Sequence, residues 1–131
     1  MDENERFEQG MAVRREVAGD VHVERAEANR NSFNEDFQDL ITRYAWGEVW
    51  SRPGLDRRTR SLITLAILVA LNREGEFRMH LIAAANNGVT RDEIKELLLQ
   101  TGIYCGLPAA NSAISLAEEV FAAADAATDG K

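Results

Sequence analysis

Apolar side chains recur at every third or fourth position along most of the chain, which is the spacing of one face of an α-helix. The alternation that is typical of β-strands is confined to one short stretch, Val21-His22-Val23. The pattern therefore predicts an all-α fold, a compact bundle of about six to seven helices joined by short connections.

Turn and capping residues mark where these helices begin and end. Pro53 breaks the third helix, and Gly88 suits the position that follows the fifth. Asp56 is suited to cap the fourth helix, and Thr90 with Glu93 has the spacing of a capping box. We expect helices over about residues 2–18, 20–29, 32–50, 56–72, 74–87, 90–105 and 109–125.

The fourth of these helices is apolar on nearly every face between Leu62 and Leu71. We expect such a helix to be central and covered on most sides, either by its own chain or by another subunit. Together with the alanine-rich last helix, it carries more apolar surface than a small bundle buries alone. This excess predicts a closed, symmetric homo-oligomer.

Composition and charge narrow the class of protein. The 131 residues suit one domain, 1–131, and 45% of them are hydrophobic and 28% charged. The net charge of -7 argues against a nucleic-acid partner, and the longest apolar run is about half a membrane span. With one cysteine, Cys105, and no signal-peptide pattern, we expect a cytoplasmic protein that binds neither nucleic acid nor a membrane.

His80 is the first candidate for chemistry. It lies between Phe77, Leu81 and Ala84 in helical spacing, so its imidazole sits at the edge of an apolar face. Two interpretations are open at this point. His80 is either a packed histidine with satisfied nitrogens or a general acid that works near neutral pH.

Glu48 is the second candidate, because it lies between Trp46 and Trp50 near the end of a helix. From the pattern alone, a surface carboxylate that points away from both indoles is the more ordinary arrangement. The alternative is a carboxylate in an apolar pocket, where desolvation raises its pKa and makes it a proton carrier.

Four arginines follow these residues and indicate an anion-binding surface. Arg52, Arg57, Arg58 and Arg60 crowd a helix start, where the helix dipole gives cations no stabilisation. A solvated basic face explains most of them, but arginine is also suited to bidentate contacts with carboxylates. No His, Cys or carboxylate spacing indicates a metal site.

Five segments carry a resemblance to a known protein family. Trp46-Gly47-Glu48 and the stretch from Trp50 to Arg58 are specific to that family, whereas Gly88-Val89-Thr90 is shared by a wider superfamily. The segments are residues 36–48, 50–61, 79–80, 87–96 and 104–111. Together they resemble the carboxymuconolactone decarboxylase family over most of the chain, and the resemblance implies an alkylhydroperoxidase-D-like fold.

One departure separates this chain from redox members of the wider superfamily. Those proteins carry a Cys-x-x-Cys pair shortly before the histidine that matches His80, but this chain has Arg73-Glu74-Gly75-Glu76 there. A thiol–disulfide peroxidase mechanism is excluded, because the sulfurs that it needs are missing. The departure favours the decarboxylase branch.

The resemblance implies decarboxylation of 4-carboxymuconolactone to 3-oxoadipate enol-lactone in protocatechuate catabolism, without cofactor or metal. Arg52 and one of Arg57 or Arg58 would bind the carboxylates of this small dicarboxylate lactone. His80 would deliver the proton, with Glu48 orienting it or acting as the acid, and Trp46 and Trp50 would exclude water. The resemblance also implies trimers or hexamers with sites near subunit boundaries.

Two alternatives stay open at this stage. The first is a superfamily relative that acts on another lactone acid or on a carboxylated enone. The second is a non-catalytic oligomer that binds small anions or serves as a scaffold.

Overall fold

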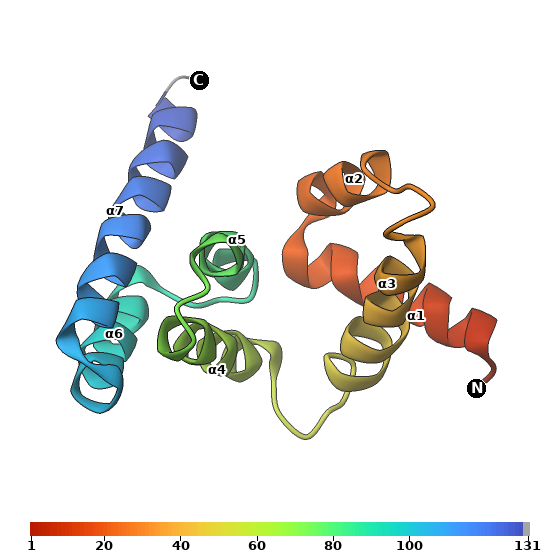
Figure 1. Ribbon diagram of the computed structural model, residues 1–131, viewed down its shortest axis with the longest axis horizontal. Coiled ribbons are helices and arrows are strands. Elements are labelled where there is room, and N and C mark those ends of the chain that lie inside the picture. Colours follow the sequence, from red (N-terminus) through yellow and green to blue (C-terminus); the bar gives the residue numbers. More distant parts are fainter. Residues whose placement is uncertain (130–131) are drawn as a thin grey trace. The chain divides into compact units, whose positions relative to one another are not determined.

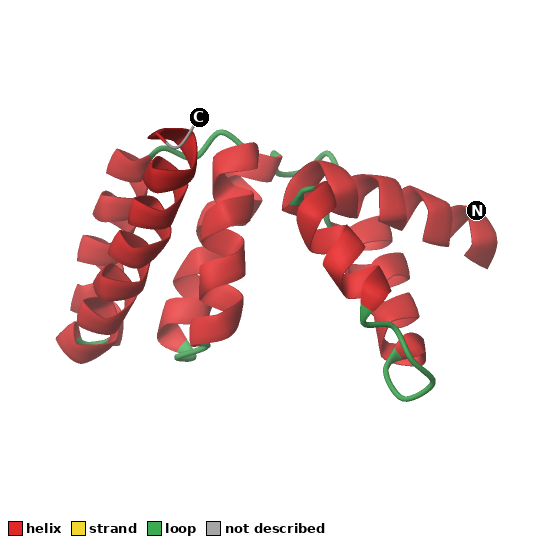
Figure 2. Ribbon diagram, turned by 90° about the horizontal axis from the view of Figure 1, so that it is seen from above, coloured by secondary structure: helices red, strands yellow, loops and turns green. Residues whose placement is uncertain are grey.

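The computed structural model describes residues 1–129, and every regular element among them is a helix (Figures 1 and 2). The predicted all-α fold is confirmed. None of the described helices is long and apolar enough to cross a membrane. The elements are α1 (Glu3–Ala18), α2 (Asp20–Ala28), α3 (Glu35–Leu40), the π-helix η1 (Ile41–Val49), α4 (Arg57–Ala70), α5 (Glu74–Asn86), α6 (Arg91–Cys105) and α7 (Leu107–Asp129).

Contacts divide the chain into two units, Met1–Arg60 and Ser61–Lys131, and each is described by itself. The first unit holds α1, α2, α3 and η1, and the second holds most of α4 together with α5, α6 and α7. Each unit has its own cluster of buried apolar residues.

In the first unit, α1 packs closely against η1 because each helix carries a glycine that faces the backbone of the other helix. A Cβ on Gly10 would overlap the carbonyl oxygen of Thr42, and one on Gly47 would lie 2.7 Å from the carbonyl oxygen of Arg6. Only a residue without a side chain allows backbones to approach this closely. The pairing places Glu48, which follows Gly47, beside the first turns of α1.

The π-helix is the main departure from the predicted elements, because the sequence pattern indicates one α-helix over residues 32–50. The backbone N–H of Trp50 donates to the carbonyl of Ala45 at 2.9 Å, which is the wider spacing of a π-turn. The carbonyl of Gly47 accepts instead from the side chains of Gln9 at 2.8 Å and Ser51 at 2.6 Å. Side chains therefore satisfy a polar group that regular helix bonding would have paired.

In the second unit, the buried faces of four helices meet in one core. Leu65 and Val69 of α4 and Phe77 and Leu81 of α5 pack with apolar residues of α6 and α7. Figure 1 shows α6 and α7 side by side, joined through Gly106, whose φ of 106° suits glycine. The core positions His80, which is on α5 beside Phe77 and Leu81.

The helix ends follow the predicted signals at most positions. Thr90 and Glu93 form both hydrogen bonds of the capping box, and the Asp56 carboxylate accepts from the backbone N–H of Thr59 at 2.7 Å. The last helix begins at Leu107 rather than 109, because the first turn of a helix tolerates a proline such as Pro108. It continues to Asp129, beyond the predicted end at 125.

Within the second unit, the fourth helix is covered on one side only. Leu65 and Val69 are buried, whereas Ile63, Ile67 and Leu71 are 44–61% exposed. The second unit by itself therefore does not supply the coverage on most sides that the sequence pattern predicts. Whether another subunit covers this face stays a prediction.

Candidate active site

The two tryptophans of the predicted site form a pair at the end of η1. Their ring centroids lie 5.4 Å apart at an angle of 34°. Trp46 is buried against Val13 and Val17 of α1, and Trp50 packs against the same cluster from a half-buried position. The pair forms an apolar wall that joins η1 to α1.

Glu48 lies between two arginines rather than in an apolar pocket. Its Oε2 accepts from Nη1 of Arg6 at 2.5 Å, and its Oε1 lies 3.6 Å from Nη1 of Arg52. The side chain of Glu48 remains 48% exposed within the chain. These contacts describe a carboxylate held by cations, which differs from the desolvated proton carrier considered in the sequence analysis.

The other predicted arginines lie at the start of α4. Nη1 of Arg57 binds the carboxylate of Glu16 on α1 at 2.5 Å, so this arginine is engaged within the first unit. Arg58 is exposed, and Nη2 of Arg60 donates to the carbonyl of Arg52 at 3.3 Å. Of the four arginines, Arg52 is the one that the structure joins to Glu48.

His80 lies on α5 in the second unit. Its neighbours Phe77, Leu81 and Ala84 are buried, while His80 itself is half-buried with its Nδ1 enclosed. The imidazole therefore sits at the edge of an apolar face, as the spacing predicts. A half-buried imidazole with one enclosed ring nitrogen is a candidate for proton exchange in a partly sheltered place.

Two arrangements could not be found by sequence reasoning. Arg6 lies 42 residues before Glu48, and nothing in the N-terminal run of charges indicates this pairing. Ser61 is buried, and its hydroxyl accepts from the side-chain amide of Asn87 at 2.9 Å. Asn87 falls in one of the family-like segments, but no local pattern predicts its partner.

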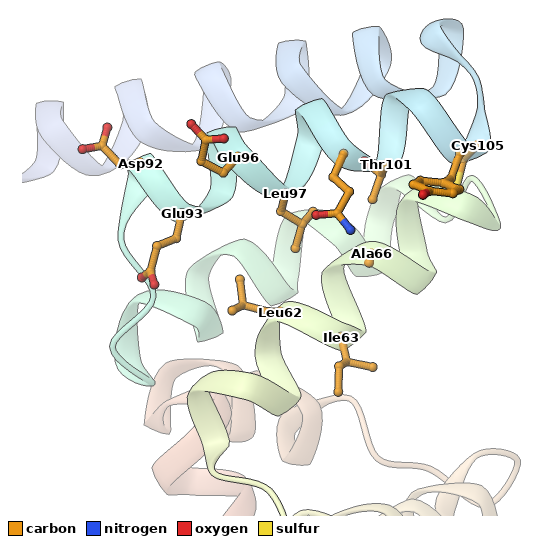
Figure 3. Close-up of a pocket in the computed structure, with 11 residues that line it drawn as sticks. Leu62, Ile63, Ala66, Asp92, Glu93, Glu96, Leu97, Thr101 and Cys105 are labelled. Atoms are coloured by element: carbon orange, nitrogen blue, oxygen red, sulfur yellow. The ribbon is translucent and has the colours of Figure 1, made fainter.

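A separate groove of about 680 Å³ opens between α4 and α6 in the second unit (Figure 3). Its floor is apolar, and Figure 3 shows carboxylates of Asp92, Glu93 and Glu96 at one end and Cys105 at the other. Cys105 is exposed and does not belong to the core. None of the predicted site residues lines this groove. No group of three or more His, Cys, Asp or Glu residues within 1–129 could hold a metal ion.

Comparisons with known proteins match this chain to a family. The family model described as "Carboxymuconolactone decarboxylase family" matches residues 35–119, which include Trp46, Glu48, Arg52 and His80. A relative from Acinetobacter baylyi named 4-carboxymuconolactone decarboxylase is 60% identical over 92% of this chain and 90% of its own. A relative from Metarhizium robertsii named nitrosuccinic acid decarboxylase is 42% identical over 88% of this chain and 80% of its own. This chain belongs to the carboxymuconolactone decarboxylase family.

Proposed function

We propose that this protein is a carboxy-lyase that converts 4-carboxymuconolactone to 3-oxoadipate enol-lactone in the β-ketoadipate branch of protocatechuate catabolism. The observation that carries the proposal is the 60% identity, over nearly the full length of both chains, to the bacterial relative of that name. The pairing of Glu48 with an arginine beside a tryptophan wall supports a site for an anionic substrate.

The substrate supplies its own electron sink for this reaction. Its carboxylated ring carbon is joined through a C=C bond to the lactone carbonyl. When the bond to the carboxylate breaks, CO2 leaves and its electron pair moves through the C=C bond to form a dienolate. A proton added to ring carbon then gives the enol-lactone, so the chemistry requires no separate electron-accepting cofactor.

The protein has three tasks in this reaction, and we assign them to named residues. Arg52, with Arg57 or Arg58, binds the two carboxylates, because guanidinium groups match carboxylates in bidentate geometry. His80 delivers the proton, because imidazole exchanges protons near neutral pH. Trp46 and Trp50 exclude water, which strengthens the interactions that stabilise the dienolate oxygen.

Glu48 has two roles left open by its sequence pattern, and its contacts favour one of them. Its carboxylate accepts a hydrogen bond from Arg6 on one oxygen and faces Arg52 with the other. A carboxylate oxygen that accepts hydrogen bonds can orient the donor groups around it. We therefore assign to Glu48 the orientation of His80, and to His80 the donation itself.

Two substitutions test these assignments. His80→Ala and Glu48→Gln should each lower turnover of 4-carboxymuconolactone by roughly 10²–10⁴, the usual contribution of a positioned acid or base. Circular dichroism should show an unchanged helix content in both variants. Full turnover in both variants would show that the assignment is wrong.

A second candidate substrate follows from the relative named nitrosuccinic acid decarboxylase. That name supports the alternative of a family member that decarboxylates a different acid. Wild-type protein should be given 4-carboxymuconolactone, nitrosuccinic acid and the lactone without its ring carboxylate, with CO2 as the readout. A preference for nitrosuccinic acid would show that this acid, rather than the lactone, is the substrate. Release of no CO2 from any of the acids would favour the non-catalytic, anion-binding alternative.

The proposal includes a homo-oligomer, a trimer or a hexamer. Its support is the apolar surface that the single chain exposes on α4, α6 and α7, which includes Ile67, Ile103 and Leu107. Exposed apolar faces of this extent mark contact sites in soluble proteins. The cytoplasmic location expected from the lone cysteine remains part of the proposal.

A further inference from the structure

The two arginines that meet Glu48 do so in unequal ways. Nη1 of Arg6 lies 2.5 Å from Oε2, which is a short charge-assisted hydrogen bond. Nη1 of Arg52 lies 3.6 Å from Oε1, which is beyond hydrogen-bond distance. The Arg6 side chain is 21% exposed and that of Arg52 is 64% exposed. Glu48 is thus bound by one arginine and only approached by the other.

Arg6 is fixed in place by several further contacts. Its Nε lies 3.4 Å from the carboxylate of Glu3, and its guanidinium carbon lies 5.4 Å from the centroid of the Tyr44 ring. The hydrogen bond to Glu48 raises the pKa of the Arg6 guanidinium above its usual value. The close approach of its backbone to Gly47 joins Arg6 to the residue that precedes Glu48. These contacts therefore hold the Arg6 guanidinium in place beside Glu48.

We propose that Arg6 is a positioning residue that occupies Glu48 and so keeps Arg52 available for a carboxylate of the substrate. The inference rests on the proposed function. A carboxylate without a close partner recruits a nearby cation, and Arg52 is already within 4 Å on the neighbouring oxygen. Without Arg6, Arg52 would close onto Glu48 and would have to break that contact before it could bind substrate.

A double-mutant cycle separates this role from a merely structural one. Arg6→Gln should raise KM for the lactone about tenfold or more, the scale of one competing charge-assisted contact. In a Glu48→Gln background the same change should alter KM less than about twofold, because no carboxylate is left to recruit Arg52. Equal effects of Arg6→Gln in both backgrounds would overturn the proposal. Arg6→Lys, which keeps the charge, should recover part of the loss.

A matched control on the same helix is Arg15→Gln. Arg15 also holds two acidic partners, Asp20 at 3.1 Å and Glu24 at 2.7 Å, but it has no contact with Glu48. Its loss removes a comparable ion pair from α1 and should leave KM unchanged. A rise in KM equal to that of Arg6→Gln would mean that any weakened ion pair on α1 disturbs the site. The positioning role assigned to Arg6 would then be wrong.

A substrate-independent measurement keeps this inference distinct from the proposed function. Hydrogen exchange of the guanidinium N–H groups, followed by NMR, should show Arg6 protected and Arg52 unprotected in the wild type. Protection of Arg52 should appear in Arg6→Gln and should be absent when Glu48→Gln is added. If Arg52 stays unprotected in Arg6→Gln, the inference is wrong even when the lactone is turned over. If the lactone is inert but protection moves as expected, only the assigned substrate fails.

Discussion

His22 shows how a single side chain of the first unit couples folding to pH. Burial lowers the pKa of its imidazole from 6.5, and the positive charges of Arg14 and Arg25 lower it further. Arg14 is itself buried, with Nη2 bonded to the side chain of Gln38 at 3.2 Å, so its charge acts in a region of reduced screening. The folded protein therefore resists protonation of His22.

A loss of stability at mildly acidic pH is the expected consequence. Because the folded-state pKa lies below the unfolded value, the contribution of His22 is complete above pH 6.5 and is lost as pH falls below it. Urea unfolding followed between pH 7.5 and 5.5 should show a steeper fall in the free energy of unfolding for wild type than for His22→Gln. Identical slopes for the two proteins would contradict this interpretation.

For single residues, the sequence indicated candidate side chains better than it indicated the residues that those side chains contact. Trp46, Trp50 and Arg52 became candidates because unusual side chains cluster within a few residues of Glu48. Arg6 was missed because its ion pair with Glu48 depends on the crossing of two helices, and no local pattern encodes a crossing. The environment of Glu48 could not be predicted from the sequence pattern either, since adjacent tryptophans do not reveal which way a carboxylate points.

At the scale of elements, helix limits were predictable where capping chemistry sets them. Thr90 with Glu93 and Asp56 with Thr59 act through residues three positions apart, so the sequence contains both partners. The π-helix was not predictable from the spacing of apolar residues, and near its end the carbonyl of Gly47 accepts from the side chains of Gln9 and Ser51. One of those partners belongs to a different helix, and π-turns are frequent near functional sites.

The helix crossing in the first unit gives a prediction for Gly10. Gly10→Ala should destabilise the protein by about 1–3 kcal/mol or more, because the new Cβ would overlap the Thr42 carbonyl and force α1 away from η1. Gly75→Ala is the control, since nothing lies within 4 Å of that position. The control should be neutral or stabilising by up to about 1 kcal/mol. Chemical unfolding of both variants measures the difference, and equal stabilities would mean that the contact does not constrain the helices.

At the scale of the whole molecule, the exposed apolar faces of the second unit are the basis for predicting a homo-oligomer. Ile67 is 51% exposed on α4, and the groove between α4 and α6 adds further apolar area. The sequence predicted this excess from the apolar pattern of residues 62–71. It could not say which face of the helix the chain leaves open, because that depends on how α5, α6 and α7 pack.

Assembly can be tested on this face by placing a charge on it. Wild-type protein should scatter light as a closed oligomer at micromolar concentration, and Ile67→Glu should shift it towards monomer, because burying an unpaired carboxylate is costly. Val21→Glu adds the same charge at an exposed position of α2 and should leave the mass unchanged. A monomeric wild type would refute the oligomer.

The proposed removal of CO2 from a carboxylated lactone can be measured on the purified wild type. The protein is mixed with freshly made 4-carboxymuconolactone, and the ultraviolet absorbance of the lactone is followed together with the CO2 released. We expect the lactone to disappear far faster than in buffer, with one CO2 released for each molecule consumed. Disappearance at the spontaneous rate, or without CO2, would show that the protein is not a decarboxylase of this lactone.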